Sequence, residues 1–346
     1  MADDSERQAR GRVTMRDVAH QAGVSQSTVS FVLNGNDNMR ISAETRRRVM
    51  KAVDLLGYNP RGAGRPPKSS KLRVIGILFD EVATSPFAAI SIEGLQEEAW
   101  KSGILVEAAM SGGDRDYENA ILRKWAGERI EGVVYASILT RRVKPPDMLA
   151  RHRAVLMNCY DADGRFGSIV PAERRGGENA TRLLLDTGHR RIAFITGEPW
   201  MEASDQRMEG HERALRQAGL PVDPSLIVEG NFLPSGGHSA TQRLLDNALD
   251  IDAIFCANDL MAVGCYEALK ERGIAVGQDI AVMGYDDQEI AQHLAPPLST
   301  VLLPHREMAQ LAARRLIDTD DAEVLQDRVE CPIVIRASHL GRQRQP

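Results

Sequence analysis

Two short amphipathic segments joined by a glycine, within residues 13–35, constrain the fold more than any other feature of the chain. The first segment starts at Thr14, with Asp17 three residues later, which is a signature of a helix N-terminus, and it ends at Gly23. Its apolar residues share one helical face: Met15, Val18, Ala19 and Ala22. The pattern predicts a helix followed by a sharp turn.

The second segment begins directly after this turn, with Ser25 placed to cap it. Helical spacing predicts an inward face of Val29, Val32 and Leu33. The outward face then consists of Gln26, Ser27, Ser30 and Phe31. Together the segments predict a helix-turn-helix, whose second helix can lie in the major groove of DNA.

A third helix and the distribution of charge support this interpretation. Ser42 is predicted to cap a helix that Gly57 ends. Its inward positions are Val49, Ala52, Val53 and Leu56, and its outward positions are Arg46, Arg47, Arg48 and Lys51. Residues 1–71 contain 13 Lys and Arg against 7 Asp and Glu, whereas the whole chain has a formal net charge of -5. The charge that attracts DNA phosphates is therefore concentrated near the N-terminus.

Length and composition restrict the class of protein. The 346 residues suggest about two or three domains. No apolar run approaches the roughly 20 residues of a membrane span, and residues 1–12 are too polar for a signal peptide. We therefore expect a cytoplasmic protein without a membrane partner. Four scattered cysteines predict neither a metal site nor a disulfide framework, namely Cys159, Cys256, Cys265 and Cys331.

Past residue 71, short apolar runs alternate with amphipathic stretches. The predicted strands are 74–79, 105–109, 132–135, 155–157, 192–196, 253–256 and 280–283. The predicted helices are 90–100, 117–126, 177–186, 209–218, 239–249 and 261–272. This alternation predicts an α/β core of two doubly wound parallel-sheet subdomains. Ligands of such sheets bind beyond the carboxyl ends of the strands, so we expect a ligand cleft between the subdomains.

With these patterns established, the chain from Val13 onward resembles bacterial transcription regulators of the lactose-repressor (LacI-type) family. Residues 13–35 are similar to the N-terminal signature of the family. Further family motifs follow in order, including LLGYNP (55–60), TGHRRIAFITG (187–197), AIFCANDLMAVG (253–264), DIAVMGYDD (279–287) and PPLSTV (296–301).

The resemblance implies a repressor of carbohydrate or related small-molecule metabolism genes that binds a pseudo-palindromic operator as a homodimer. It also implies a core similar to periplasmic sugar-binding proteins, in which an effector, a sugar or sugar derivative, closes the cleft and changes operator affinity. The expected organisation is a disordered tail (1–12), a DNA-binding headpiece (13–57), a basic hinge (58–71), an N-subdomain (72–170 with 302–328) and a C-subdomain (171–301 with 329–346).

On the family pattern, Gln26 and Ser27 read bases, and Phe31 lies one turn further along the same face. Glutamine is suited to bidentate recognition of adenine. Phe31 departs from the polar or basic residue that relatives often have, and it either contacts a thymine methyl group or packs back on the third helix. Short polar groups suited to phosphate oxygens are Ser25, Thr28, Ser30 and Asn34; Ser25 is also explained as a cap and Asn34 as a turn residue.

The hinge is a second departure from the family. Relatives usually have a short helix there, but residues 59–71 read NPRGAGRPPKSSK, whose prolines and glycines break helices. Arg61 and Arg65, in Pro-Arg-Gly and Gly-Arg-Pro elements, are similar to an AT-hook that lays arginines along the narrow minor groove of A·T-rich DNA. The alternative is a flexible basic linker that contacts phosphates alone.

The resemblance also indicates effector-binding residues. Arg207 matches the arginine with which relatives clamp an effector, and Asn258 and Asp286 match polar ligands at strand ends. Phe87 and Phe232 correspond to aromatic residues that lie against the ligand. Asn158, at another strand end, completes the predicted set. Structural alternatives stay open: Arg207 as a surface residue at a helix start, Asp286 as a turn residue, and Phe87 and Phe232 as core residues. Two aromatic residues are expected near the cleft, Tyr160 and Trp200, while Asp259 is interpreted as the N-cap of the following helix.

Two other classes of protein fit less well. A periplasmic sugar-binding protein would have no use for the helix-turn-helix. An enzyme such as a sugar kinase would need a phosphate-binding loop, but the glycine pairs at 112–113, 176–177 and 236–237 are isolated. We therefore expect no catalytic residues, no cofactor and no metal. The C-terminal residues 331–346 contain a last strand but no heptad repeat, which favours a dimer over a tetramer.

Overall fold

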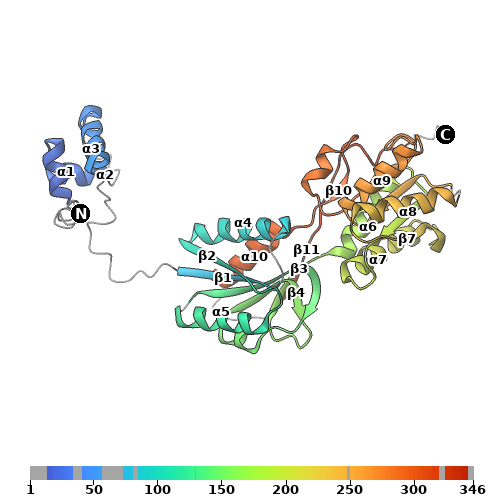
Figure 1. Cartoon of the computed structure of the whole chain (residues 1–346), viewed down its shortest axis with the longest axis horizontal. Helices are drawn as coiled ribbons and strands as arrows, with labels where there is room; N and C mark the ends of the chain where they lie inside the picture. The colour runs from blue at the N-terminus through green and yellow to red at the C-terminus, as the bar shows by residue number, and fades with distance from the viewer. Residues whose placement is uncertain are drawn as a thin grey trace, which may run out of the picture. The chain divides into compact units, whose positions relative to one another are not determined.

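A computed structural model describes residues 14–33, 41–56, 73–80, 85–128, 130–247, 250–318 and 324–341. The chain divides into two compact units, Met1–Lys71 and Leu72–Pro346. Figure 1 shows their helices and strands, with many of them labelled.

The first unit contains three helices, α1 (Met15–Ala22), α2 (Gln26–Leu33) and α3 (Ala43–Leu56). Thr14 and Asp17 cap α1 reciprocally, because the Thr14 backbone N–H donates to Asp17 Oδ2 at 2.8 Å and the Asp17 N–H donates to Thr14 Oγ1 at 3.4 Å. Gly23 ends α1 in the left-handed region, with φ of 64°. The helices enclose a core of Val18, Ala19, Ala22, Val29, Val32, Val49, Ala52 and Val53. The predicted helix-turn-helix and third helix are confirmed.

The second unit begins with a six-stranded parallel sheet in the order β11-β5-β4-β3-β1-β2. Its strands are β1 (Arg73–Phe79), β2 (Ile104–Met110), β3 (Gly132–Val143), β4 (Ala154–Asp161), β5 (Gly167–Pro171) and β11 (Gln326–Val329). Helices α4 (Pro86–Lys101) and α10 (His305–Asp318) cover one face, and α5 (Arg115–Glu128) covers the other (Figure 1). Successive residues of β1 therefore enter different apolar clusters: Ile77 packs with α4 and α10, and Leu78 packs with α5.

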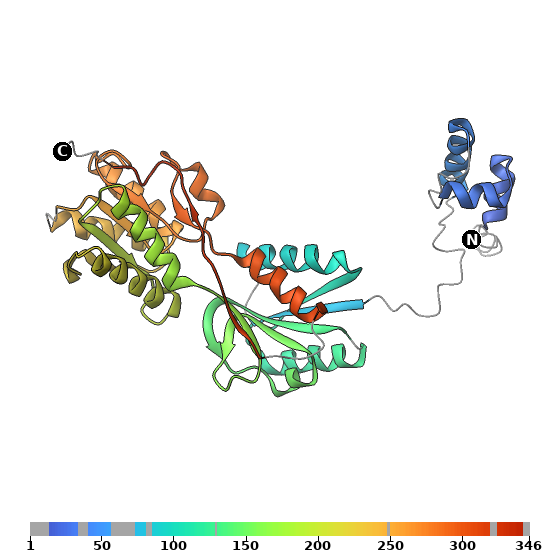
Figure 2. The same ribbon diagram turned by 180° about the vertical axis from the view of Figure 1, so that it is seen from behind.

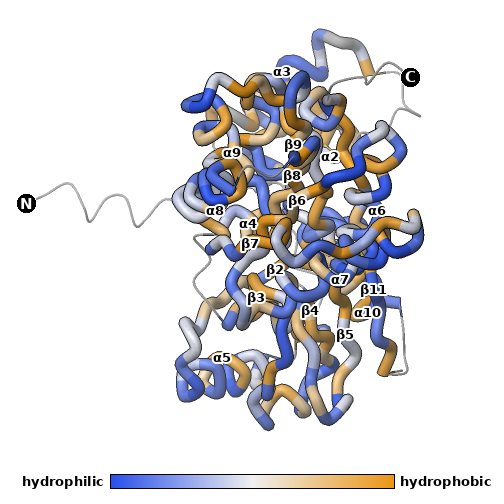
Figure 3. The backbone as a smooth tube through the Cα atoms, turned by 90° about the vertical axis from the view of Figure 1, so that its right-hand side faces the viewer, coloured by the Kyte–Doolittle hydropathy of each residue, from blue (hydrophilic) through white to orange (hydrophobic). Residues whose placement is uncertain are grey.

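A second parallel sheet has four strands in the order β7-β6-β8-β9. They are β6 (Ile192–Thr196), β7 (Ile227–Glu229), β8 (Ala253–Cys256) and β9 (Ala281–Met283). Its helices pack in pairs, α6 (Glu173–Asp186) with α7 (Glu202–Gln217) and α8 (Pro234–Asp246) with α9 (Asp259–Glu271). Figure 3 shows the contrast between the hydrophobic β6 and the largely hydrophilic α5. The predicted fold class, a helical headpiece with two parallel α/β subdomains, is confirmed.

The chain passes three times between the two sheets of the second unit (Figure 2). The first passage follows β5, the second links β10 (Thr300–Val301) to α10, and the third links β11 to β12 (Ile333–Val334). β10 and β12 pair in antiparallel fashion on the side of the smaller sheet. Segments distant in sequence thus complete each subdomain, and three connecting segments of the chain join the two subdomains.

Several elements differ from the sequence prediction. The predictions did not include β5, β7, β10, β11 or α10. The strands among them have two to five residues, too few to show a periodicity, and the buried stripe of α10 consists largely of alanine. All six helices predicted in the core begin two to seven residues earlier than predicted: α4, α5, α6, α7, α8 and α9. In α6, α7 and α8 the first turn carries proline, glycine or charged residues, which do not extend an apolar stripe. None of the helices in the described ranges has the length and apolar character to cross a membrane.

Candidate functional site

Helix α2 presents most of the residues predicted to face DNA. Val29 and Val32 are buried in the headpiece core, whereas Gln26 and Ser27 are exposed. The Ser25 hydroxyl accepts a hydrogen bond from the Thr28 backbone N–H at 3.1 Å. Ser25 therefore caps α2, and the exposed face of the helix begins at its first turn.

Phe31 lies at the edge of this face. Its side chain is half-buried, as is that of Ser30. Within the described residues, the partly buried apolar side chains packed on the headpiece core are Met15, Val24, Leu33, Ile41 and Leu56. Phe31 is not one of them, and the choice between a thymine contact and packing on the third helix stays a prediction. Asn34, Arg61 and Arg65 lie outside the described residues, and their roles stay predictions.

In the second unit, Arg207 on α7 is almost fully buried, and two carboxylates and a backbone carbonyl surround its guanidinium group. Its Nε and Nη2 donate to the two carboxylate oxygens of Glu173 at 2.8 and 3.0 Å. Its Nη1 lies 3.3 Å from Asp286 Oδ1 and donates to the Ala257 carbonyl, and the guanidinium carbon lies 3.7 Å from the centre of the Tyr285 ring. Burial opposes its charge, but Glu173 and Asp286 outweigh that effect and raise the pKa of Arg207.

Asp286 follows β9, and its backbone has a φ of 105°, a value that residues other than glycine rarely adopt. Burial raises its pKa to about 6, an effect that Arg207 opposes and Glu173 reinforces. The Gln288 amide donates to Asp286 Oδ2 at 3.2 Å. A carboxyl group with this pKa changes its protonation state close to neutral pH.

Glu173 was not predicted from the sequence, where the glycine pair at 176–177 of the same helix is the one signal nearby. A Cβ atom at Gly177 would collide with the Arg207 carbonyl oxygen, and one at Gly176 would collide with the Tyr285 hydroxyl. The pair therefore lets α6 approach both groups closely enough for Glu173 to reach the guanidinium. The glycine pair therefore serves helix packing around Arg207, a role that the spacing of residues along the chain cannot reveal.

Asn258 and Phe232 lie together, and the structure corrects the interpretation of Asp259. Asn258 is the N-cap of α9, since its Oδ1 accepts from the Met261 backbone N–H at 2.8 Å, so the expected cap at Asp259 is wrong. The Asn258 amide donates to the Phe232 carbonyl at 3.0 Å. Asp259 is instead buried, and its two oxygens accept from the Thr300 hydroxyl and the Gln288 backbone N–H.

Phe87, on α4 of the N-subdomain, lies at the same cavity as Asp286. Its ring stacks on His305 with centroids 4.7 Å apart and an interplanar angle of 22°. Burial, with a smaller contribution from Arg207, lowers the pKa of His305 to about 3, so this ring is neutral. Phe87 and Asp286 both line an open cavity of about 900 Å³ whose walls also include Leu260, Gln288 and Leu303. Residues of both subdomains therefore meet at one cavity.

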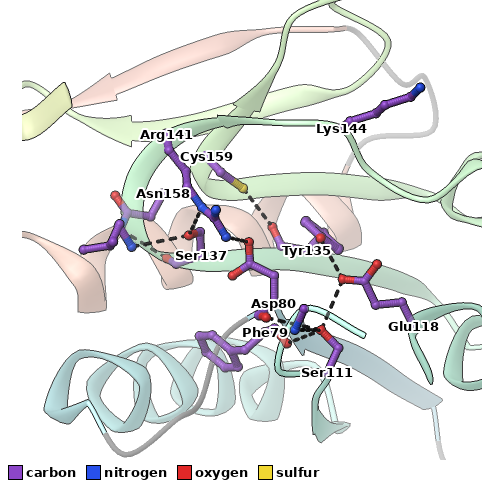
Figure 4. A network of polar contacts seen from close by, with 12 residues as sticks. Phe79, Asp80, Ser111, Glu118, Tyr135, Ser137, Arg141, Lys144, Asn158 and Cys159 are labelled. Atoms are coloured by element: carbon purple, nitrogen blue, oxygen red, sulfur yellow. Dashed lines mark hydrogen bonds and ion pairs between the residues drawn. The ribbon is translucent and has the colours of Figure 1, made fainter. Parts of the chain in front are cut away.

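Asn158 belongs to a separate polar network at the carboxyl ends of β1, β3 and β4 (Figure 4). Its Oδ1 accepts from Thr140 Oγ1 at 2.6 Å, and its amide donates to the Ser137 carbonyl at 3.1 Å. Arg141 donates to Ser137 Oγ at 3.2 Å and to Asp80 Oδ2 at 2.6 Å. Asp80 and Arg141 were not identified from sequence, because only the fold brings the ends of three strands together.

The same network extends to α5. Glu118 Oε1 accepts from the Tyr135 hydroxyl at 2.9 Å and from Ser111 Oγ at 3.2 Å (Figure 4). Tyr160, expected near the cleft, donates from its hydroxyl to Glu202 at 2.9 Å and so links β4 to α7, while Trp200 is exposed.

Backbone strain also concentrates at the predicted site. Among the described residues, the non-glycine positions with positive φ are Asn158, Phe232, Asp286 and Asp287. Such conformations are unfavourable, most of all for phenylalanine, and persist where the surrounding structure imposes them. Three of the six predicted effector residues thus have backbones that local sequence preference does not explain. In the same described parts, no group of His, Cys, Asp and Glu is arranged to hold a metal ion, and the four cysteines are buried thiols.

Comparisons with known proteins assign the chain to a family. Residues 14–61 match the model for bacterial regulatory proteins of the lacI family, and residues 181–339 match the model for a periplasmic binding protein-like domain. The first match covers the helix-turn-helix, and the second covers the Arg207 and Asp286 region.

Whole-chain relatives agree. The chain is 33% identical over 304 residues to the ribose operon repressor of Haemophilus influenzae and 34% identical over 310 residues to the HTH-type transcriptional repressor PurR of Vibrio atlanticus; each alignment covers 88% of this chain and 91% of the relative. A solved transcriptional regulator CelR–cellobiose complex is similar with 31% identity and a TM-score of 0.64, covering 94% of this chain and 100% of that one. The chain belongs to the lacI family of bacterial regulatory proteins, and it is a DNA-binding transcriptional regulator with a periplasmic-binding-protein-like core.

Proposed function

We propose that this protein is a cytoplasmic repressor that binds a pseudo-palindromic operator as a homodimer and changes operator affinity when a neutral sugar binds in its core. The observation that carries the proposal is the buried Arg207, held between Glu173 and Asp286 beside a cavity to which both subdomains contribute. A ligand that contacts both walls of such a cavity favours one arrangement of the subdomains over another.

The charge of the site favours a neutral, hydroxylated effector. Arg207 is balanced by two carboxylates, so the site offers no surplus positive charge to a phosphate or carboxylate ligand. A guanidinium has five N–H donors, and four of those of Arg207 are directed at Glu173, Ala257 and Asp286. The remaining donor and the acceptor oxygens of Asp286 suit the hydroxyl groups of a sugar.

Aromatic and amide groups complete the proposed effector site. Phe87 and Phe232 would lie against the apolar face of a sugar ring, and Asn158 and Asn258 would orient it through the strand ends that they occupy. The solved relative bound to cellobiose and the ribose operon repressors support a sugar as the effector. The names of the PurR relatives mention no sugar, so a ligand screen has to identify the effector.

A ligand screen tests this effector class. Pentoses, hexoses, disaccharides, sugar phosphates and nucleobases are added to the full-length protein while thermal unfolding is followed. A ligand at 100 times its dissociation constant should add about 2.7 kcal/mol to the free energy of unfolding. Stabilisation by a neutral sugar, absent with its phosphate ester, supports the proposal; stabilisation by a sugar phosphate or a nucleobase alone contradicts it.

At the operator, we infer that Gln26 and Ser27 contact bases and that Phe31 contacts a thymine methyl group. The phosphate contacts would come from Ser25, Thr28, Ser30 and Asn34. If Arg61 and Arg65 enter the minor groove, replacing central A·T pairs by G·C should weaken binding, and Arg61→Ala with Arg65→Ala should remove most of that preference. Equal losses on both operators would instead indicate a flexible basic linker.

A further inference from the structure

A second concave surface, distinct from the effector cavity, lies on the outer side of α6. It encloses about 580 Å³, and the basic residues of its lining are Arg174, Arg175, Arg182, Arg213 and Arg328. Two acidic residues, Glu178 and Glu330, also line it. The lining therefore carries a formal excess of three positive charges. We call this surface the arginine groove.

The helical period of α6 separates this groove from the effector site. The inner face of α6 is buried and carries Glu173, Gly177 and Leu184. Residues 174, 175, 178 and 182 follow the same period on the opposite, solvent side. Arg213 is supplied by α7 of the same subdomain, whereas Arg328 is supplied by β11 of the larger sheet. A ligand in the groove would therefore contact both subdomains.

Arg182 and Arg213 both pair with Glu178 of the groove, at 2.6 and 3.4 Å. The other three arginines of the groove are available for a stronger partner. Arg175 pairs with Glu330 at 3.0 Å, with 66% and 61% of the two side chains exposed. Arg174 pairs with Glu209 at 2.6 Å with similar exposure. Such solvent-exposed pairs stabilise a protein little and exchange readily. Arg328 is exposed and makes no ion pair within the part of the chain that the structure describes.

We propose that the arginine groove binds a small organic polyphosphate, a molecule with two or more adjacent phosphate groups. Guanidinium groups bind phosphate oxygens in a bidentate manner, and their convergence from α6, α7 and β11 matches an anion with several charges rather than one. The volume is that of a small-molecule site. Duplex DNA is a poorer fit, since it requires basic residues along an extended surface rather than around one hollow.

Titration calorimetry on the full-length protein tests the proposal, with inorganic tripolyphosphate, pyrophosphate and orthophosphate as probes at constant ionic strength. The test variant is Arg175→Gln with Arg328→Gln. The matched control is Arg216→Gln with Arg272→Gln, which removes the same charge from two exposed arginines that pair with Glu212 and Asp246 outside the groove. All four positions are exposed, so both variants should keep the thermal midpoint of the wild type.

We expect tripolyphosphate to bind at least about ten-fold more tightly than orthophosphate, and the groove variant to lose at least about ten-fold in affinity, because charge-assisted hydrogen bonds are the stronger ones. The control should change less than about two-fold. Equal losses in both variants would show a general effect of net charge and overturn the proposal, as would absence of binding or binding that neither variant weakens. A groove variant that weakens operator binding but not tripolyphosphate binding would make the groove a DNA contact instead.

Discussion

The headpiece and the core build their functional surfaces in opposite ways. In α2, the residues proposed to contact DNA are exposed or half-buried and stand on an ordinary helix, whose core is formed by other residues such as Val29 and Val32. In the core, Arg207 and Asp286 are buried, carry charge and are held by strained backbone or by close helix packing. Recognition and stability are thus separable in the first unit and combined in the second.

The largest effect expected from this difference is on the stability of the core. Arg207→Ala would leave Glu173 and Asp286 buried without their cation, and breaking such a pair costs about 3–5 kcal/mol in the free energy of unfolding. Urea denaturation of the variant measures this cost. Arg216→Ala, on the same helix but exposed, is the control and should change stability by less than about 0.5 kcal/mol. Equal midpoints for both variants would remove the structural role of Arg207.

The next effect concerns pH. Burial raises the pKa of Asp286 to about 6. Between about pH 4 and pH 6, this carboxyl group therefore binds a proton more tightly in the folded protein than in the unfolded protein. The free energy of unfolding should therefore gain up to about 3 kcal/mol from this group as pH falls through that range. Denaturation of wild type and of Asp286→Asn at several pH values measures the difference. The variant should have a flatter profile, and identical profiles would contradict a raised pKa.

In the headpiece, the expected loss is in affinity rather than stability. Gln26→Ala should weaken operator binding by about 1–3 kcal/mol and relax the preference at one base pair, because a bidentate contact with a base is lost. Since Gln26 is exposed, thermal unfolding should be unchanged. Fluorescence anisotropy with operators altered at single positions measures both affinity and preference. A uniform loss over all operator variants would indicate a phosphate contact.

The smallest effect separates the two roles of Ser25. Ser25→Ala removes the cap of α2 and should cost about 1 kcal/mol of headpiece stability. Ser25→Asp restores a capping oxygen but adds a negative charge beside the proposed phosphate contact. Stability should therefore recover in the aspartate variant while operator affinity falls further. If affinity recovers together with stability, Ser25 acts through the cap alone.

Much of the fold was predictable because its patterns are local. The Thr14–Asp17 capping box, Gly23 and the headpiece stripe depend on residues within one or two helical turns of each other, and the structure confirms them. The strands β1, β6 and β8 have continuous apolar runs, since both faces of their sheets are covered. The elements missed, such as β11 and α10, owe their place to distant partners rather than to their own pattern.

The sequence by itself determined the helix-turn-helix, the parallel α/β class and the family, because helical period, strand alternation and motif order are properties of contiguous residues. Tertiary structure alone decided that Glu173, not a residue near Arg207 in sequence, balances the buried guanidinium, and that Asp80 and Arg141 join Asn158 in one network. It also decided that Arg328 faces the arginines of α6, 146 or more positions earlier in the chain. Charge interactions depend on distance in space, and the fold sets that distance between segments that no local pattern relates.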